Sequence, residues 1–315
     1  MRIKPAPINT EGTADRSFSV GGQLVAAPRA EAGLYLVSTP IGNLGDITLR
    51  ALETLAGADI IACEDTRITR RLMERYGIAA ELMTYHEHNA ATARPKIMQR
   101  LAEGRSVALV SDAGTPLISD PGFKLVREAA SAGHKVVALP GPSAVLTALA
   151  VATLPTDRFY FEGFLPAKQA ARRARLSELA RTDATLVLFE SGNRVQEALV
   201  DLAELLGSRE AAICRELTKL HEEVVRATLP ELAARAGTLE TRGEFVLVIA
   251  PPHADEQVLA TDALDELLRD QLGHRSVKDA VAHAVALSGR PRREVYARAL
   301  ELSASMRARD RDDQG

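Results

Sequence analysis

The chain has 315 residues, of which 46% are hydrophobic, so it can bury at least one large core, and its length favours two domains. Its formal net charge of −3 excludes a global basic field, so a polyanionic partner must meet a local basic patch. No uncharged apolar run approaches the ~20 residues that span a bilayer, so we expect no membrane contact.

Residues 1–30 mix proline, glycine, serine and charges without the apolar segment of a signal peptide, which predicts a disordered extension. From residue 31 to 154, apolar strand-like runs alternate with helical runs of about ten residues. The expected strands are 34–38, 59–63, 82–85, 106–111 and a run ending at Leu139. The expected helices are 46–55, 67–76, 90–102, 121–132 and 143–152. This alternation is typical of βαβ units in a parallel sheet.

A second α/β domain is expected over residues 155–252, after a boundary at Leu154–Asp157. Its density of strands suggests a mixed sheet. The expected strands are 158–164, 185–189, 210–214 and 244–249, and the expected helices are a basic run near 168–175, 195–206 and 230–236. Residues 253–315 predict a helical extension with a charged tail, and the runs 277–287 and 293–302 permit a helix-turn-helix-like pair.

A ligand site is predicted where the strand 106–111 ends. The following turn, Asp112–Gly122, is rich in glycine, proline and aspartate, and Asp120-Pro121 is typical of a helix start. A glycine-rich turn at the carboxyl end of a strand, opening onto a helix, is where open α/β sheets bind ligands.

Carboxylates gather at the same predicted edge of the sheet. Glu64 and Asp65 directly follow one strand, and Asp112 directly follows another. Asp65 either caps a helix or serves the site, whereas Asp112, in a glycine turn, is a stronger functional candidate. Such a group of carboxylates suits a cationic ligand or a catalytic base.

The chain lacks the motifs of several common binding sites and catalytic centres. No G-x-G-x-x-G follows a strand, and neither G-x-x-x-x-G-K-[ST] nor G-x-S-x-G occurs. His86 and His88 have no third ligand at zinc-like spacing, so we predict no metal. Cys63 and Cys214 lie far apart in apolar runs, which indicates reduced, buried thiols in a cytoplasmic protein.

Four motifs together resemble the ribosomal RNA small-subunit methyltransferase I family, a branch of the tetrapyrrole (corrin/porphyrin) methylases. They are Leu34–Thr48, Cys63-Glu-Asp-Thr-Arg67, Ser111–Gly122 and Leu139-Pro-Gly-Pro-Ser143. The match extends through Phe161–Pro166, Phe189–Ser191 and Arg215–Lys219, and covers about residues 33–250. The resemblance implies a two-domain α/β tetrapyrrole-methylase-like fold with S-adenosylmethionine in the cleft between the domains, usually in a homodimer. It also implies methylation of the ribose 2′-hydroxyl of a cytidine in 16S rRNA near the decoding centre of the small ribosomal subunit.

The resemblance also implies roles for individual residues. The implied cofactor contacts are Ile41, Gly42, Ala113, Gly114, Thr115, Ile118, Ser143, Ala144, Glu190 and Ala227. Asp112 and Glu64 are the candidates for a base or for a carboxylate facing the sulfonium, and Asn43 is a candidate for orienting the ribose. The first loop reads Ser-Thr-Pro-Ile-Gly-Asn instead of the Gly-x-Gly-Pro-Gly of pyrrole-methylating members, which favours RNA over a macrocycle.

RNA contacts are expected from local clusters of basic residues, although such residues also occur simply as solvated helix faces. The clusters are Arg67, Arg70 and Arg71; Lys168, Arg172, Arg173 and Arg175; and Arg290, Arg292 and Arg293. Two alternatives stay open: a pyrrole C-methyltransferase of cobalamin or siroheme synthesis, and a non-catalytic ribosome-binding module with a vestigial cofactor site.

Overall fold

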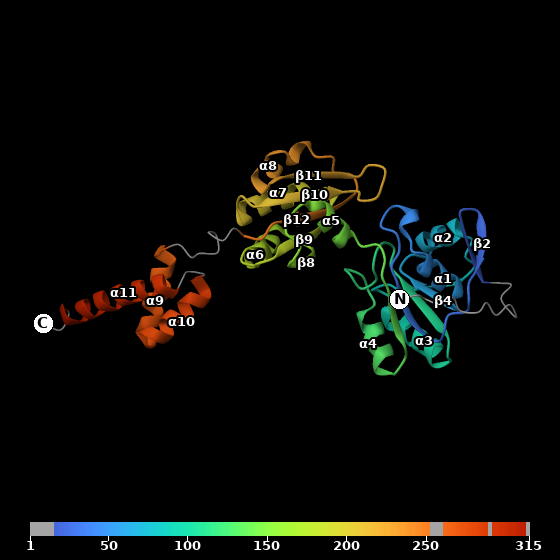
Figure 1. The fold of residues 1–315 in the computed structure, drawn as a ribbon, viewed down its shortest axis with the longest axis horizontal. Helices are drawn as coiled ribbons and strands as arrows, with labels where there is room; N and C mark the ends of the chain where they lie inside the picture. The colour runs from blue at the N-terminus through green and yellow to red at the C-terminus, as the bar shows by residue number, and fades with distance from the viewer. Residues whose placement is uncertain (1–15, 253–260, 289–291, 313–315) are drawn as a thin grey trace, which may run out of the picture.

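The structure, a computed structural model, describes residues 16–252, 261–288 and 292–312 as two sheets with their helices and a C-terminal group of three helices (Figure 1). The predicted fold class, α/β with one parallel and one mixed sheet, is confirmed. In the part of the chain that the structure describes, no helix combines the length and apolar character needed to cross a membrane.

The first sheet is parallel throughout and has the strand order β5-β4-β6-β3-β7. Its strands are β3 (Gly33–Val37), β4 (Ile60–Cys63), β5 (Glu81–Thr84), β6 (Ser106–Val110) and β7 (Val136–Leu139). Every residue of β6 is buried, as expected for a central strand covered on both faces. Because all five strands point the same way, the loops that leave their carboxyl ends lie at one edge of the sheet.

Helices cover both faces of this sheet (Figure 1). They are α1 (Leu49–Gly57), α2 (Thr66–Arg75), α3 (Ala90–Ala102) and α4 (Phe123–Ser131), whereas the next helix, α5 (Ala144–Ala152), packs on the second sheet. The helices α1 and α2 pack on one face, whereas α3 and α4 pack on the other. A short 3-10 turn, η1 (Leu44–Asp46), precedes α1, whose N-cap is Thr48. The Thr48 hydroxyl accepts a hydrogen bond from the amide of Ala51, so the helix begins at Leu49 and not at residue 46 as expected.

The second sheet is mixed, with the order β11-β10-β12-β9-β8 and one parallel pair, β8 with β9. Its strands are β8 (Phe159–Phe164), β9 (Thr185–Ser191), β10 (Glu210–Arg215), β11 (Glu223–Thr228) and β12 (Glu244–Ile249). One face is covered by α6 (Gln169–Leu179), α7 (Gly192–Leu206), α8 (Leu229–Ala234) and the 3-10 turn η2 (Ala236–Thr238). The other face packs against α5, which joins Val187, Val246 and Val248 in one core.

The edge strand β11 was not predicted. Its sequence, Glu-Val-Val-Arg-Ala-Thr, is polar at both ends and at Arg226, and it directly follows His221-Glu222. An edge strand pairs along one side only, and charged residues are common there, so its apolar signal is weak.

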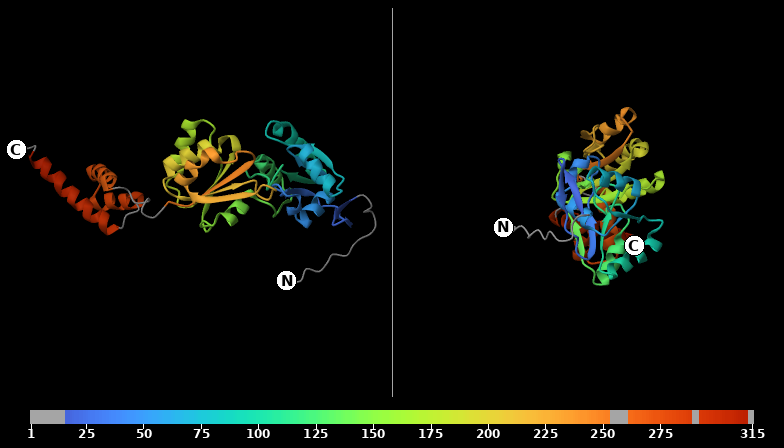
Figure 2. Two further views of the ribbon diagram at one scale, coloured as in Figure 1. Left: turned by 90° about the horizontal axis from the view of Figure 1, so that it is seen from above. Right: turned by 90° about the vertical axis from the view of Figure 1, so that its right-hand side faces the viewer.

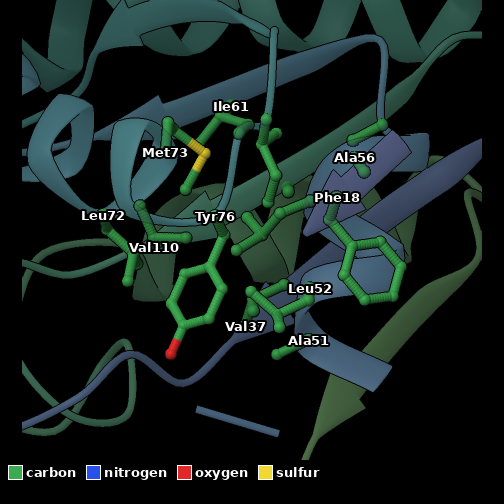
Figure 3. Close-up of a cluster of buried hydrophobic side chains, with 14 of the residues drawn as sticks. Phe18, Val37, Ala51, Leu52, Ala56, Ile61, Leu72, Met73, Tyr76 and Val110 are labelled. Atoms are coloured by element: carbon green, nitrogen blue, oxygen red, sulfur yellow. The ribbon is translucent and has the colours of Figure 1, made fainter. Parts of the chain in front are cut away.

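The expectation of disorder is wrong for residues 16–30. They form an antiparallel hairpin of β1 (Ser17–Val20) and β2 (Gln23–Ala26). Phe18 is 4% exposed and shares a core with Leu52 and Ala56 (Figure 3). Arg16 also binds the Asp59 carboxylate at 2.7 Å. One aromatic anchor and one partly buried ion pair therefore fix a segment whose composition resembles that of a tail. Residues 1–15 lie outside the described residues.

Three helices follow the second domain (Figure 2). They are α9 (Thr261–His274), α10 (Val277–Ser288) and α11 (Arg292–Asp312). Leu268, Val281 and Val295, one from each helix, are fully buried in a common core. The expected helical pair is therefore joined by a third helix, α9. Of the third basic cluster, Arg290 lies outside the described residues.

Candidate active site

A cavity of about 420 Å³ lies between the two domains. The first domain contributes the loop after β3, the end of β4, the loop after β6 and the first turn of α5. The second domain contributes β8, β9, the end of β10 with its following loop, and the start of β12. The volume lies in the range of small-molecule sites, and the carboxyl edge of a parallel sheet is where such sites form.

Hydrogen bonds hold three loops of the first domain together around Gly114. Gly114 and Thr39 exchange backbone hydrogen bonds of 3.0 and 2.9 Å, which join the β6 loop to the β3 loop. The Thr115 hydroxyl donates to the carbonyl of Pro142 at 3.2 Å and lies 3.1 Å from the Ser38 hydroxyl, which adds the β7 loop. Gly114 has φ +82°, a conformation that side chains rarely adopt, so glycine is needed for this arrangement.

Unusual backbone conformations occur on both sides of the cavity. In the first domain Leu117 and Ser119 have φ of 78° and 62°, and in the second domain Glu216 and Thr218 have φ of 50° and 67°. A non-glycine residue in this region costs about 1–3 kcal/mol and persists only where surrounding contacts enforce it, most often at binding sites. The two strained loops support the assignment of this cavity as the functional site.

Three carboxyl groups line the first-domain side: Glu64, Asp112 and Asp120. Asp112 accepts a hydrogen bond from the amide of Asp65 at 3.0 Å, and Glu64 is hydrogen-bonded to Asp120. Burial, with the neighbouring charges of Asp120 and Asp112, raises the pKa of Glu64 to about 7. Burial also raises the pKa values of Asp112 and Asp120. Proton exchange near neutral pH is therefore within reach of this cluster.

Asp65, the third carboxylate of the sequence argument, has a structural role. It is the N-cap of α2, and its side chain accepts hydrogen bonds from the backbone amide of Arg67 at 2.8 Å and from the Arg67 guanidinium. It does not line the cavity. Its place in the cluster is taken by Asp120, which the sequence assigned to a helix start.

All of the predicted cofactor contacts line the cavity except Gly42 and Ala227. Gly42 instead lies at the junction between the domains, where an added Cβ would meet Lys219 Cγ at 2.4 Å. The Ala227 side chain packs against the core under α7 and α8 and does not line the cavity, and its contact with the cofactor stays a prediction. Sequence reasoning missed part of the second-domain lining: Phe164, Cys214, Leu217, Gly243 and Phe245.

Asn43 is not aimed into the cavity. Its side-chain oxygen accepts a hydrogen bond from Gly45 at 3.0 Å and so caps η1. Its backbone amide donates to the Thr218 hydroxyl at 3.1 Å, which links the two domains. The structure therefore places Asn43 at a domain junction, and its role in orienting the ribose stays a prediction.

The second domain contributes its own buried carboxylate. The Glu190 side chain is 1% exposed, accepts a hydrogen bond from the Ser191 amide at 2.9 Å and lies 3.3 Å from the Arg194 guanidinium. Nearby, Lys219 Nζ lies 2.8 Å from carboxylate oxygens of both Glu216 and Glu244. These contacts fix the polar side chains of this wall, so they need not reorganise when a ligand binds.

The first predicted basic cluster is exposed, beside the cavity. Helix α2 begins two residues after Glu64, and Arg67, Arg70 and Arg71 are exposed along it. Arg67 pairs with Asp65, whereas no ion pair among the described residues involves Arg70 or Arg71.

The second cluster differs from its prediction. Arg172 is buried, 1% exposed, and binds Asp201 at 2.7 Å, so it does not present its charge to a phosphate. Arg173 also binds Asp201, at 2.8 Å, and Arg175 binds Glu162 at 2.7 Å. Only Lys168 of this cluster is exposed without an ion pair among the described residues. The guanidinium groups of α6 thus attach it to its neighbours.

A metal site needs several ligating side chains that lie close together. Within residues 16–252, 261–288 and 292–312, no group of three or more His, Cys, Asp or Glu side chains is arranged to hold a metal ion. The His86 and His88 rings, 6.1 Å apart, contact one another edge to face.

Fold and sequence together define the class. Residues 33–233 match the family described as Tetrapyrrole (Corrin/Porphyrin) Methylases. The solved structure of a cobalamin biosynthetic enzyme, cobalt precorrin-4 methyltransferase CbiF, aligns with a TM-score of 0.53 at 18% identity, covering 69% of this chain and 94% of that one. The chain has the tetrapyrrole methylase fold.

More similar sequences narrow the assignment. Residues 258–303 match the family described as the RsmI C-terminal HTH domain. A relative from Mesorhizobium japonicum, named ribosomal RNA small subunit methyltransferase I, is 49% identical over 285 residues, which is 90% of this chain and 96% of the relative. A relative of the same name from Escherichia coli O157:H7 is 45% identical over 279 residues, covering 88% and 97%. The chain belongs to the ribosomal RNA small subunit methyltransferase I family.

Proposed function

We propose that this protein transfers a methyl group from S-adenosylmethionine to the ribose 2′-hydroxyl of a cytidine in 16S rRNA near the decoding centre. The observation that carries the proposal is the cavity between the domains, lined by a rigid glycine loop and three carboxyl groups, in a member of this family. The structure of the site supports the class of reaction, and the family resemblance supplies the nucleotide.

The cavity residues suit the donor. Ile41, Val145, Leu217 and Phe245 offer apolar contact to the adenosine, and the backbone around Gly114 offers hydrogen bonds to its polar atoms. When bound, the donor supplies a sulfonium methyl group, and its positive charge is complementary to the carboxylates on the first-domain side. Loops locked by backbone hydrogen bonds keep these groups in place and exclude water.

The acceptor hydroxyl has a high pKa and is a poor nucleophile at neutral pH. A carboxylate whose pKa lies near the working pH can take its proton as the bond to carbon forms. Glu64, with a pKa of about 7, meets this requirement, and Asp112 lies beside it in the cavity.

The RNA reaches the site over α2 in this proposal. Arg70 and Arg71 are exposed on the helix that begins beside Glu64, and Arg67 lies one turn closer to the cavity. Lys168 is a contact from the second domain. The substrate is rRNA in the small subunit, the working unit is a homodimer, and the reaction takes place in the cytoplasm, where these subunits are found.

The test incubates the protein and labelled S-adenosylmethionine with small ribosomal subunits, and separately with uroporphyrinogen. We expect label in 16S rRNA at one cytidine, in a linkage that resists alkali because a 2′-O-methyl group blocks strand cleavage. Asp112→Asn should lower turnover more than tenfold. Label in the tetrapyrrole, or in a base instead of a ribose, contradicts the proposal, and donor binding without any transfer favours a binding module.

A further inference from the structure

Asp120 has no individual role in the proton transfer described above, although its carboxyl group lines the same cavity as Glu64 and Asp112. Glu64 and Asp120 lie close enough in this lining for their carboxyl groups to share a proton. It lies in a turn where Ser119 has φ 62° and Gly122 has φ 137°. An added Cβ at Gly122 would lie 2.6 Å from Leu117 Cδ2, so the path of this turn has little freedom. The backbone of this turn therefore sets the position of Asp120 at the cavity.

Two carboxyl groups that hydrogen-bond one another must share a proton, since two carboxylates offer no donor. When both groups are ionised, their charges repel in a half-buried site, and taking up one proton relieves that repulsion. A carboxylate beside a second carboxylate is therefore a stronger base than one that is alone. The two groups titrate as one unit with shared pKa values.

We propose that Asp120 is a positioning residue of this site: its charge makes the Glu64 carboxylate a stronger base for the proton that the acceptor hydroxyl loses, and its carboxylate then holds the protonated Glu64 in place. This inference rests on the proposed methyl transfer. The hydroxyl oxygen forms a bond to the methyl carbon, and the carbon–sulfur bond breaks with its electron pair remaining on sulfur. The hydroxyl proton moves to Glu64, where the Asp120 carboxylate accepts a hydrogen bond from it. The pair changes from two negative charges to one.

Other titratable groups surround the pair and remain in place when Asp120 is replaced. They are Asp112, Cys63, Asp65 and Arg67 in the first domain, and Glu190 and Glu244 on the second-domain side of the cavity. A difference between the wild type and a variant at position 120 thus reports the loss of one partner from the pair.

The experiment compares the pH dependence of kcat/KM for the wild type, Asp120→Asn and Asp120→Glu, with Asp183→Asn as a control at an exposed carboxylate of the second domain. We expect the wild-type rate to rise with pH through about 7, following Glu64. In Asp120→Asn the rise of kcat/KM with pH should occur at least one pH unit lower. The same variant should reduce kcat about ten- to hundredfold and leave the KM for the donor nearly unchanged. Asp120→Glu keeps a carboxylate, so its kcat/KM should rise near the wild-type pH. The Asp183→Asn control should match the wild type.

A second readout needs no turnover. The Glu64 carboxyl carbon, followed by NMR in labelled protein, should titrate at lower pH in Asp120→Asn than in the wild type. An active wild type whose pH profile survives Asp120→Asn overturns this inference and leaves the proposed function intact. An inactive wild type overturns the proposed function, and the Glu64 titration then still decides whether the pair exists.

Discussion

Replacing Asp201 with asparagine should destabilise the second domain strongly. The side chains of Asp201 and Arg172 are each 1% exposed and lie 2.7 Å apart. In Asp201→Asn, Arg172 keeps its charge, and its other carboxylate partner, Glu197, lies 3.4 Å away and is 72% exposed. Leaving a buried charge without its partner costs about 3–5 kcal/mol. Arg172→Met should cost only about 1–3 kcal/mol, because Asp201 keeps its 2.8 Å contact with Arg173.

Urea unfolding of both single variants and of the double variant Arg172→Met/Asp201→Asn measures these losses. The double variant removes both charges, so its loss should fall short of the sum by at least about 1 kcal/mol. The salt dependence of RNA binding completes the assay. The slope is that of log binding constant against log salt concentration. Arg172→Met should keep the wild-type slope, whereas Arg70→Gln should reduce its magnitude by about 0.7–0.9, the value of one phosphate contact. Additive losses, or a reduced slope with unchanged stability in Arg172→Met, would refute this reasoning.

Two further predictions concern the domain junction and the N-terminal hairpin. Gly42→Ala should weaken donor binding about tenfold in calorimetry, because its Cβ would lie 2.4 Å from Lys219 Cγ and overpacking costs ~1–3 kcal/mol. Gly237→Ala, where nothing lies within 4 Å of the added Cβ, is the control, and equal affinities in the two variants would contradict the prediction. Burial alone would raise the pKa of Asp59, but hydrogen bonds from backbone and arginine donors outweigh it and hold the pKa well below its usual range. The stabilisation is therefore full above about pH 4 and is lost as the pH falls towards the folded-state pKa. Asp59→Asn should be less stable than the wild type at pH 7 and lose less stability on acidification, as thermal unfolding at several pH values will reveal.

The first domain was the more predictable part, because its signals are local. Strands buried on both faces read as continuous apolar runs, and parallel strands bring their carboxyl ends to one edge. This is why Glu64 and Asp112, which are far apart in sequence, could be expected in one cavity. Asp120 was missed because a proline after an aspartate is typical of a helix start. In the structure α4 begins only at Phe123, since the turn continues through Gly122 at φ 137°.

The misassigned features depend on contacts between distant segments. From the sequence, an arginine on a helix is expected at the surface. The partner that allows Arg172 to be buried, Asp201, lies 29 residues away on another helix. In the same way, nothing local marks Phe18 as the anchor of an ordered hairpin, because its partners Leu52 and Ala56 belong to α1. Long-range pairing of this kind is decided by the fold as a whole, so residue type and spacing do not reveal it.

The position of α5 has a consequence for how this molecule can be divided. By chain order the helix completes the first domain, yet Val145, Ala148 and Leu149 pack into the core of the second sheet. A fragment ending at residue 154 would carry a nearly all-apolar helix, Ala-Val-Leu-Thr-Ala-Leu-Ala-Val-Ala, without the sheet that buries it. A fragment beginning at residue 155 would expose the opposite half of the same core. Recombination between relatives should therefore break the chain before α5, so that the helix and the second sheet come from the same parent.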